Sequence, residues 1–254
     1  MALSPYIVTK GVVLRETETR DADKILTLLT AERGKLSVIA RGVCRKGCKF
    51  AACAQPLAYS EWTLYKKGDW YYANEGATLE LFNGLRADLD AMALGFYLAE
   101  LTEAVTTEDA PHQGLLSHLL NGLYAVSVLR KPLPLVKAAF EIKLCLAGYE
   151  PLADACAYCG CPDPQQPYFD VLQGVLRCGT CGEGRRGFPL CRDSLAALRH
   201  IVYGDPKRLY SFTLGPEAQK RLSAAAEAFV SAQLERGFRT LDFYKSVRCM
   251  NEPS

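Results

Sequence analysis

The 254-residue sequence lacks any apolar run of the roughly 18–20 residues that a membrane-spanning helix needs. Its first residues, Met1 to Tyr6, have neither the basic segment nor the apolar segment of a secretory signal. We therefore expect a cytoplasmic protein that has no membrane partner and whose thiols stay reduced.

Catalytic motifs are missing as well. The sequence contains no P-loop, no Gly-x-Gly-x-x-Gly and no nucleophile elbow. Histidine is scarce, and the spacing of His112, His118 and His200 suggests no catalytic or metal-binding partner for any of them. We therefore predict no catalytic residues and a protein that is not an enzyme.

Cysteine, in contrast, is abundant, with 11 residues. Cys156 and Cys159 form one Cys-x2-Cys pair, and Cys178 and Cys181 form a second pair 18 residues further on. Two such turns can aim four thiolates at one centre, which is typical of a structural zinc site. Four thiolates leave no position for an activated water, so we expect one Zn²⁺ with a structural role. Cys161 remains an alternative ligand.

A second group of cysteines, Cys44, Cys48 and Cys53, has a spacing that fits no common metal motif, and no histidine lies nearby. We expect a loop of accessible or half-buried thiols there. The same loop is basic: four cations lie within nine residues that contain no acid, and two more lie on or beside the neighbouring strands. The predicted DNA-binding residues are Lys24, Lys35, Arg41, Arg45, Lys46 and Lys49. A loop that only aids solubility is the alternative.

Charge is unevenly distributed along the chain. Residues 1–80 hold 12 lysines and arginines against 9 acidic residues, whereas residues 81–150 hold 5 against 8. A polyanion would therefore bind the N-terminal third. Six aromatic side chains of this region could stack on bases, although such residues more often fill a core: Tyr59, Trp62, Tyr65, Trp70, Tyr71 and Tyr72.

The hydrophobic pattern predicts an α+β protein. About five short strands joined by glycine turns occur within residues 7–73, including 24–30, 36–40 and 59–65, and they suit a small closed barrel such as the OB-fold. A helical pattern follows from residue 81, with Leu85, Leu89 and Leu101 on one face. Further helices are expected at 112–130, 132–148, 193–203 and 216–235.

The order of these motifs resembles that of a known family, the bacterial recombination mediator RecO. The resemblance covers essentially the whole chain and is carried by the following segments: Gly11–Arg15, Ala22–Thr30, Arg33–Gly42, Gln55–Leu57, Gly148–Pro151, Cys156–Gly160, Phe169, Gly174–Cys181 and Gly237–Leu241. It implies an N-terminal OB-fold and a C-terminal helical domain with an inserted four-cysteine zinc module. The expected boundaries are 1–80 for the barrel, 81–151 and 191–254 for the helical domain, and 152–190 for the zinc module.

The resemblance also implies a function. A RecO-like protein of the RecF pathway binds single- and double-stranded DNA, anneals complementary strands and helps load recombinase onto DNA coated by single-stranded DNA-binding protein (SSB). Its partners would be RecR and the acidic tail of SSB, which ends in phenylalanine. Arg130 and Lys131, beside Leu129 and Leu133, are candidates for the tail site, and the protein would associate with the nucleoid.

The sequence departs from the family at the basic loop, where cysteines stand in place of basic or small residues. Two other interpretations of the sequence remain open. One is a zinc-ribbon transcription or RNA-binding factor, and the other is an enzyme that uses a Cys-x2-Cys pair or a zinc-bound water.

Overall fold

The computed structural model describes residues 6–19, 21–108, 110–111, 113–144, 148, 150–181 and 187–251. His112 and Tyr149 lie outside these residues. The chain divides into two compact units, Met1–Val128 with Phe238–Ser254, and Leu129–Gly237. The finer boundaries expected from the sequence stay a prediction. Among the described helices, none is both long enough and apolar enough to cross a membrane.

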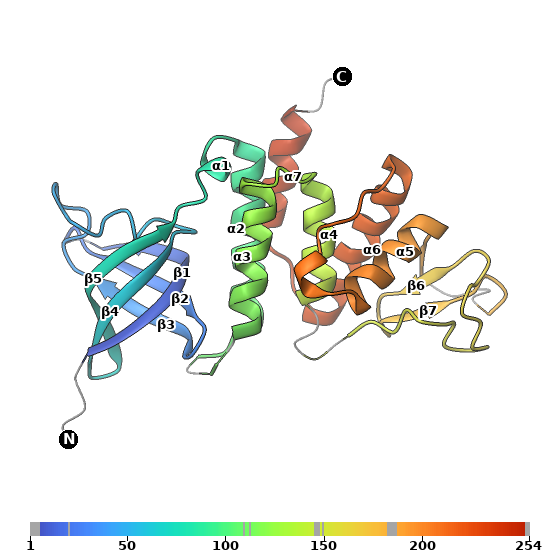
Figure 1. Cartoon of the computed structure of the whole chain (residues 1–254), viewed down its shortest axis with the longest axis horizontal. Coiled ribbons are helices and arrows are strands. Elements are labelled where there is room, and N and C mark those ends of the chain that lie inside the picture. The colour runs from blue at the N-terminus through green and yellow to red at the C-terminus, as the bar shows by residue number, and fades with distance from the viewer. Residues whose placement is uncertain are drawn as a thin grey trace. The chain divides into compact units, whose positions relative to one another are not determined.

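The first unit begins with five strands and continues with helices (Figure 1). Its elements are β1 (Tyr6–Glu18), β2 (Lys24–Thr30), β3 (Gly34–Ala40), β4 (Tyr59–Lys67), β5 (Trp70–Glu80), α1 (Asn83–Arg86), α2 (Leu89–Val105), α3 (Gln113–Ser127) and α7 (Arg239–Asn251).

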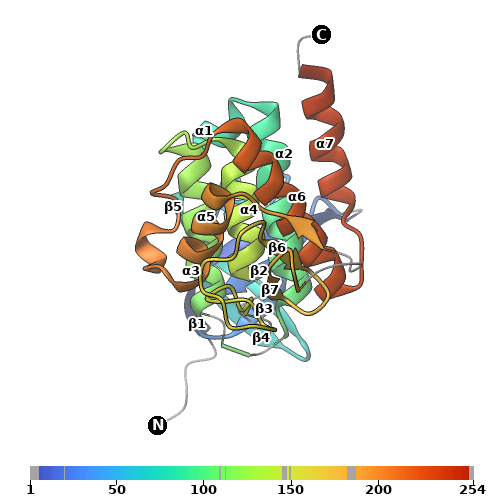
Figure 2. The same cartoon turned by 90° about the vertical axis from the view of Figure 1, so that its right-hand side faces the viewer.

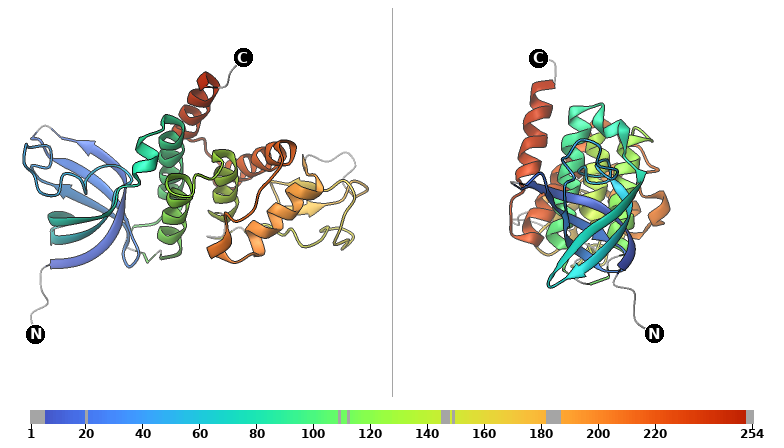
Figure 3. Two further views of the ribbon diagram at one scale, coloured as in Figure 1. Left: turned by 45° about the horizontal axis from the view of Figure 1, so that its top comes forward. Right: turned by 90° about the vertical axis from the view of Figure 1, so that its left-hand side faces the viewer.

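The five strands form a closed barrel in the order β1-β2-β3-β5-β4, which is the OB-fold expected from the sequence (Figure 3). Strand β1 pairs with both β2 and β4, and this double pairing closes the barrel. The contact between β3 and β5 is short and parallel, with Val38 opposite Tyr71 and Ile39 opposite Tyr72. This short contact completes the closure of the barrel.

Side chains alternate between the two faces of each strand, and the inward-facing ones fill the barrel interior. Trp62 and Leu64 are fully buried, as their spacing on β4 predicts. Tyr71 of β5 joins the same core, and so do Val43 and Cys53 from the loop that connects β3 to β4. Strand β5 is longer than expected and runs to Glu80, because its second half, Glu75–Glu80, continues the pairing with β4 along Tyr59–Thr63.

The helices of this unit correct one expectation. Leu85 and Leu101 are buried, but Leu89 is 60 % exposed. The predicted continuous face is wrong because the helix is interrupted: α1 ends at Arg86, and the Asp88 carboxylate accepts a hydrogen bond from the Ala91 amide and starts α2 in a new register. Helix α7 packs against α2, where the Thr240 amide donates to Glu100 Oε2 at 3.1 Å.

The second unit combines helices with a small three-stranded sheet, and its elements can be followed in Figure 2. They are α4 (Leu133–Leu144), β6 (Tyr168–Asp170), β7 (Val175–Arg177), β8 (Phe188–Pro189), α5 (Arg192–Tyr203), a 3-10 helix (Pro206–Arg208) and α6 (Pro216–Leu234).

Helices α4 and α6 form the centre of this unit. Val136, Phe140 and Leu144 of α4, spaced four residues apart, are all buried. The buried Lys137 ammonium lies 2.7 Å from Glu141 and 3.0 Å from Glu227, so one cation joins α4 to α6. Burial opposes the charged form of Lys137, but the two carboxylates outweigh it and raise its pKa.

The turn between β2 and β3 yields a testable prediction. Gly34 has φ +61, and a Cβ there would lie 2.1 Å from the Ala110 carbonyl oxygen. Gly68 has nearly the same φ, +62, but no atom lies within 4 Å of its Cβ position. We expect Gly68→Ala to cost about 1–2 kcal/mol from backbone strain alone. Gly34→Ala should cost a further ~1–3 kcal/mol from overpacking.

Urea unfolding, monitored by tryptophan fluorescence, measures the free energy of unfolding of both variants. Equal loss of stability in the two would show that the close approach to Ala110 does not matter.

Candidate metal centre and nucleic-acid interface

Both Cys-x2-Cys turns lie at one end of β7. The second turn follows β7 directly, at Cys178. The first turn is held beside the same strand, because the Ala157 amide donates to the Leu176 carbonyl at 2.9 Å and Leu176 donates to Leu152 at 3.0 Å. These backbone hydrogen bonds help bring residues 156–159 and 178–181 together.

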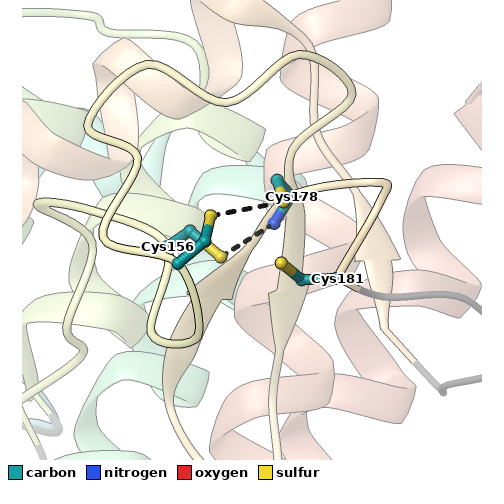
Figure 4. Close-up of side chains that lie close together, drawn as sticks. Cys156, Cys178 and Cys181 are labelled. Carbon is teal, nitrogen blue, oxygen red and sulfur yellow. Dashed lines mark hydrogen bonds between the residues drawn. The ribbon is translucent and has the colours of Figure 1, made fainter.

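The four thiols that the sequence predicts do converge. The sulfur atoms of Cys156, Cys159, Cys178 and Cys181 all lie within 4.8 Å of one another. Figure 4 shows Cys156, Cys178 and Cys181 pointing toward a common centre. The sulfurs of Cys159 and Cys178 are 3.7 Å apart. Sulfurs at about 2.3 Å from a tetrahedral metal would be separated by roughly 3.8 Å, so the group can hold a metal ion.

Hydrogen bonds within this group favour the thiolate form of Cys178 and the thiol form of Cys181. The Cys178 amide donates to Cys156 Sγ at 3.3 Å, and the Thr180 hydroxyl lies 3.0 Å from Cys178 Sγ. Thr180 and the neighbouring Cys181 lower the pKa of Cys178 to about 6. The bonds that Cys181 makes with Cys178 and Cys159 raise the pKa of Cys181 to about 12. A metal cation at the centre would favour the thiolate form of all four.

Two other cysteines of the second unit have different roles. Cys161 braces the first turn through its backbone, since its carbonyl accepts the Cys156 amide at 2.9 Å. In the described part of the chain, its thiol does not belong to the four-sulfur group. Cys191 precedes α5, where its sulfur accepts the Ser194 hydroxyl at 3.4 Å.

Two arginines that sequence analysis missed support the module. Arg199 of α5 donates to the carbonyls of Ala153 at 2.8 Å and Asp154 at 3.0 Å, and also to Pro162. Arg177 forms a buried ion pair with Asp170 across the β6–β7 hairpin. A lone arginine in a helix or a three-residue strand gives no signal in the sequence, because its partners are backbone carbonyls or a residue on another strand.

In the first unit, the predicted basic residues fall into two groups. Arg41, Arg45, Lys46 and Lys49 are exposed on the loop between β3 and β4. Lys24 is half-buried and lies 2.8 Å from Glu16. Burial lowers the pKa of Lys24, but the Glu16 carboxylate outweighs this effect and raises it. Its charge is therefore already balanced within the barrel.

The basic loop is anchored to the barrel. Successive turns fold it, with the Arg45 amide donating to Gly42 at 3.0 Å and the Cys48 amide donating to Arg45 at 3.2 Å. The loop thiols differ in exposure: Cys44 is exposed, Cys48 is half-buried and Cys53 is buried beside Thr78. The described cysteines of this loop form no metal group.

The remaining candidates occupy separate places. Lys35 lies on β3 and lines a hollow of about 230 Å³ together with Trp70 and Glu108. Arg130 and Lys131 precede α4; Arg130 is exposed with φ 51, and Lys131 is half-buried.

The barrel, the helices and the four-thiol group define an OB-fold protein that carries, in a helical region, a four-cysteine module able to hold a metal ion. Comparison with known families agrees with this class. Residues 1–82 match the family "Recombination protein O N terminal", and residues 86–242 match "Recombination protein O C terminal".

Curated relatives align along nearly the whole chain. The DNA repair protein RecO of Acetivibrio thermocellus is 31 % identical over 245 residues, which cover 95 % of this chain and 97 % of the relative. RecO of Symbiobacterium thermophilum is 32 % identical, covering 94 % and 96 %. RecO of Anaeromyxobacter sp. strain K is 35 % identical, covering 89 % and 91 %. The chain belongs to the RecO family, and its role lies in DNA repair and recombination.

The metal centre yields a second prediction. Cys178→Ala removes a ligand and leaves three thiols, so the bound metal should be lost and segment 151–190 should become sensitive to protease. Cys161→Ala is the matched control, because this neighbouring thiol lies outside the group. Elemental analysis and limited proteolysis measure the two effects. Metal lost from Cys161→Ala but kept by Cys178→Ala would contradict the assignment.

Proposed function

We propose that this protein is a recombination mediator without enzymatic turnover. It binds single- and double-stranded DNA, anneals complementary strands and helps load recombinase onto SSB-coated DNA. The observation that carries the proposal is the basic loop fixed on a closed OB-fold barrel, in a chain that belongs to the RecO family. Three of its exposed cations, Arg45, Lys46 and Lys49, follow one another in an ordered series of turns.

We propose further that the metal is one structural Zn²⁺. Four cysteine sulfurs that lie within 4.8 Å of one another match the preference of zinc among the common cellular divalent ions. The thiolates fill all four positions, so a bound zinc would keep no open site for water. The zinc would hold the cysteine module against α5, from which Arg199 donates a hydrogen bond to the Ala153 carbonyl.

The partners proposed for this chain follow from the family. They are RecR and the acidic tail of SSB, with Arg130 and Lys131 as the cations that would meet the tail carboxylates. The second site is supported by the position of these residues just before α4 and next to Leu129, which is 49 % exposed. A cytoplasmic protein associated with the nucleoid is consistent with these partners.

Charge reversal tests the DNA interface. We expect Arg45→Glu, Lys46→Glu and Lys49→Glu together to weaken binding of single-stranded DNA. The slope of log affinity against log salt should become shallower by about 2, because each phosphate contact contributes about 0.7. The matched control reverses Lys207 and Arg208, which are exposed on the second unit. Fluorescence anisotropy at several salt concentrations gives both quantities. An unchanged slope in the loop variant would show that the DNA binds elsewhere.

Strand annealing tests the mediator role. Complementary oligonucleotides coated with SSB should anneal faster in the presence of this protein, and the loop variant should lose the acceleration. RNA oligonucleotides of the same sequence provide the comparison for an RNA-binding factor. Absence of acceleration on DNA would overturn the proposed function.

A further inference from the structure

The aromatic residues of the barrel strands fall into two sets, one in the core and one that faces outward. Trp62 is 0 % exposed and Tyr71 is 6 % exposed, so both belong to the core. Trp70 and Tyr72 flank Tyr71 on β5 and face the opposite way, because successive side chains of a strand alternate between its two faces. Trp70 is 42 % exposed, and Tyr72 is half-buried.

The outward aromatics are contiguous across three strands. Tyr65 of β4 lies opposite Tyr72, and their rings stack with centroids 5.1 Å apart and an angle of 15°. Tyr6 of β1 lies opposite Tyr65 on its other side and meets it edge to face at 6.1 Å. We call Tyr6, Tyr65, Trp70 and Tyr72 the aromatic platform.

Cations border this platform on two sides. The Arg41 guanidinium lies over the Tyr72 ring at 4.8 Å, and Arg41 is the first residue of the basic loop. Lys35 shares a hollow of about 230 Å³ with Trp70, which Asp69 and Glu108 also line. The platform is thus continuous with the residues proposed to meet phosphates.

We propose that the aromatic platform binds unpaired bases of single-stranded DNA by stacking. Exposed rings beside cations suit a strand whose base faces are accessible, whereas a duplex hides the faces of its bases in the stack. Trp70 offers an exposed indole surface. Arg41 lies over the Tyr72 ring, and its guanidinium can donate hydrogen bonds to a phosphate. This inference rests on the proposed DNA-binding function and adds the part of the strand that the barrel recognises.

Tryptophan fluorescence provides a direct probe, because the chain has only 2 tryptophans and one of them is Trp62, in the core. Titration with oligo(dT) should quench Trp70 as thymines stack on it. An oligomer of equal length made of abasic deoxyribose phosphate should bind through its phosphates without that quenching. In Trp70→Phe, oligo(dT) should leave the remaining fluorescence of Trp62 unchanged.

Affinity gives a second, independent measure. Trp70→Ala should lower the affinity for oligo(dT) roughly tenfold, the loss of about one stacked base, with less than about a twofold change for duplex DNA. The matched control is Tyr124→Ala, which removes a 47 % exposed aromatic of α3. Circular dichroism of each variant shows that the barrel still folds, and Trp70→Phe keeps a ring at this position.

The outcomes separate the two proposals. Tight binding of oligo(dT) without quenching, and with unchanged affinity in Trp70→Ala, would overturn the platform and leave DNA binding in place. Failure of both oligomers to bind at low salt would overturn the proposed function and the platform with it.

Discussion

Closure of the barrel by β1 is the constraint on which the first unit depends. This strand pairs with β4 through Tyr6–Val12 and with β2 through Gly11–Glu18, so the two ladders overlap at Gly11 and Val12. A Cβ at Gly11 would lie 2.9 Å from the Leu29 carbonyl oxygen, and glycine permits this close approach. A bulge at Leu14 then bends the strand. Val13 packs in the barrel core, and Val12 and Leu14 are buried outside that core cluster.

The second unit has a different constraint. Strands of three, three and two residues cannot form a stable sheet by themselves, so the cysteine module needs other ties. The buried pair of Arg177 and Asp170 links β6 to β7, and Arg199 links the first cysteine turn to α5. The four sulfurs join the two turns to each other, and a bound metal would convert this local convergence into folding free energy.

Sequence patterns were informative where the signal is local. Alternation on β4 gave the burial of Trp62 and Leu64, and the paired Cys-x2-Cys spacing gave the four sulfurs that converge. The helical periodicity failed at Leu89, which is exposed because the neighbouring Asp88 caps a new helix. The patterns also do not show ion pairs between strands, such as that of Lys24 with Glu16. Register and ion pairing between strands depend on tertiary contacts, which a periodic pattern does not encode.

The arrangement of the aromatic platform depends on a shift of one residue in the pairing of β4 with β5. Thr63 lies opposite Glu75 and Leu64 lies opposite Ala73, so Asn74 is an extra residue on β5. Without this bulge, Tyr65 would stand opposite Ala73 instead of Tyr72, and the two rings would lose their stack. The bulge also keeps Tyr71 in the core while Tyr72 points outward beneath Arg41. Bulges re-aim side chains, and here one bulge aligns an aromatic row with the cation that begins the basic loop.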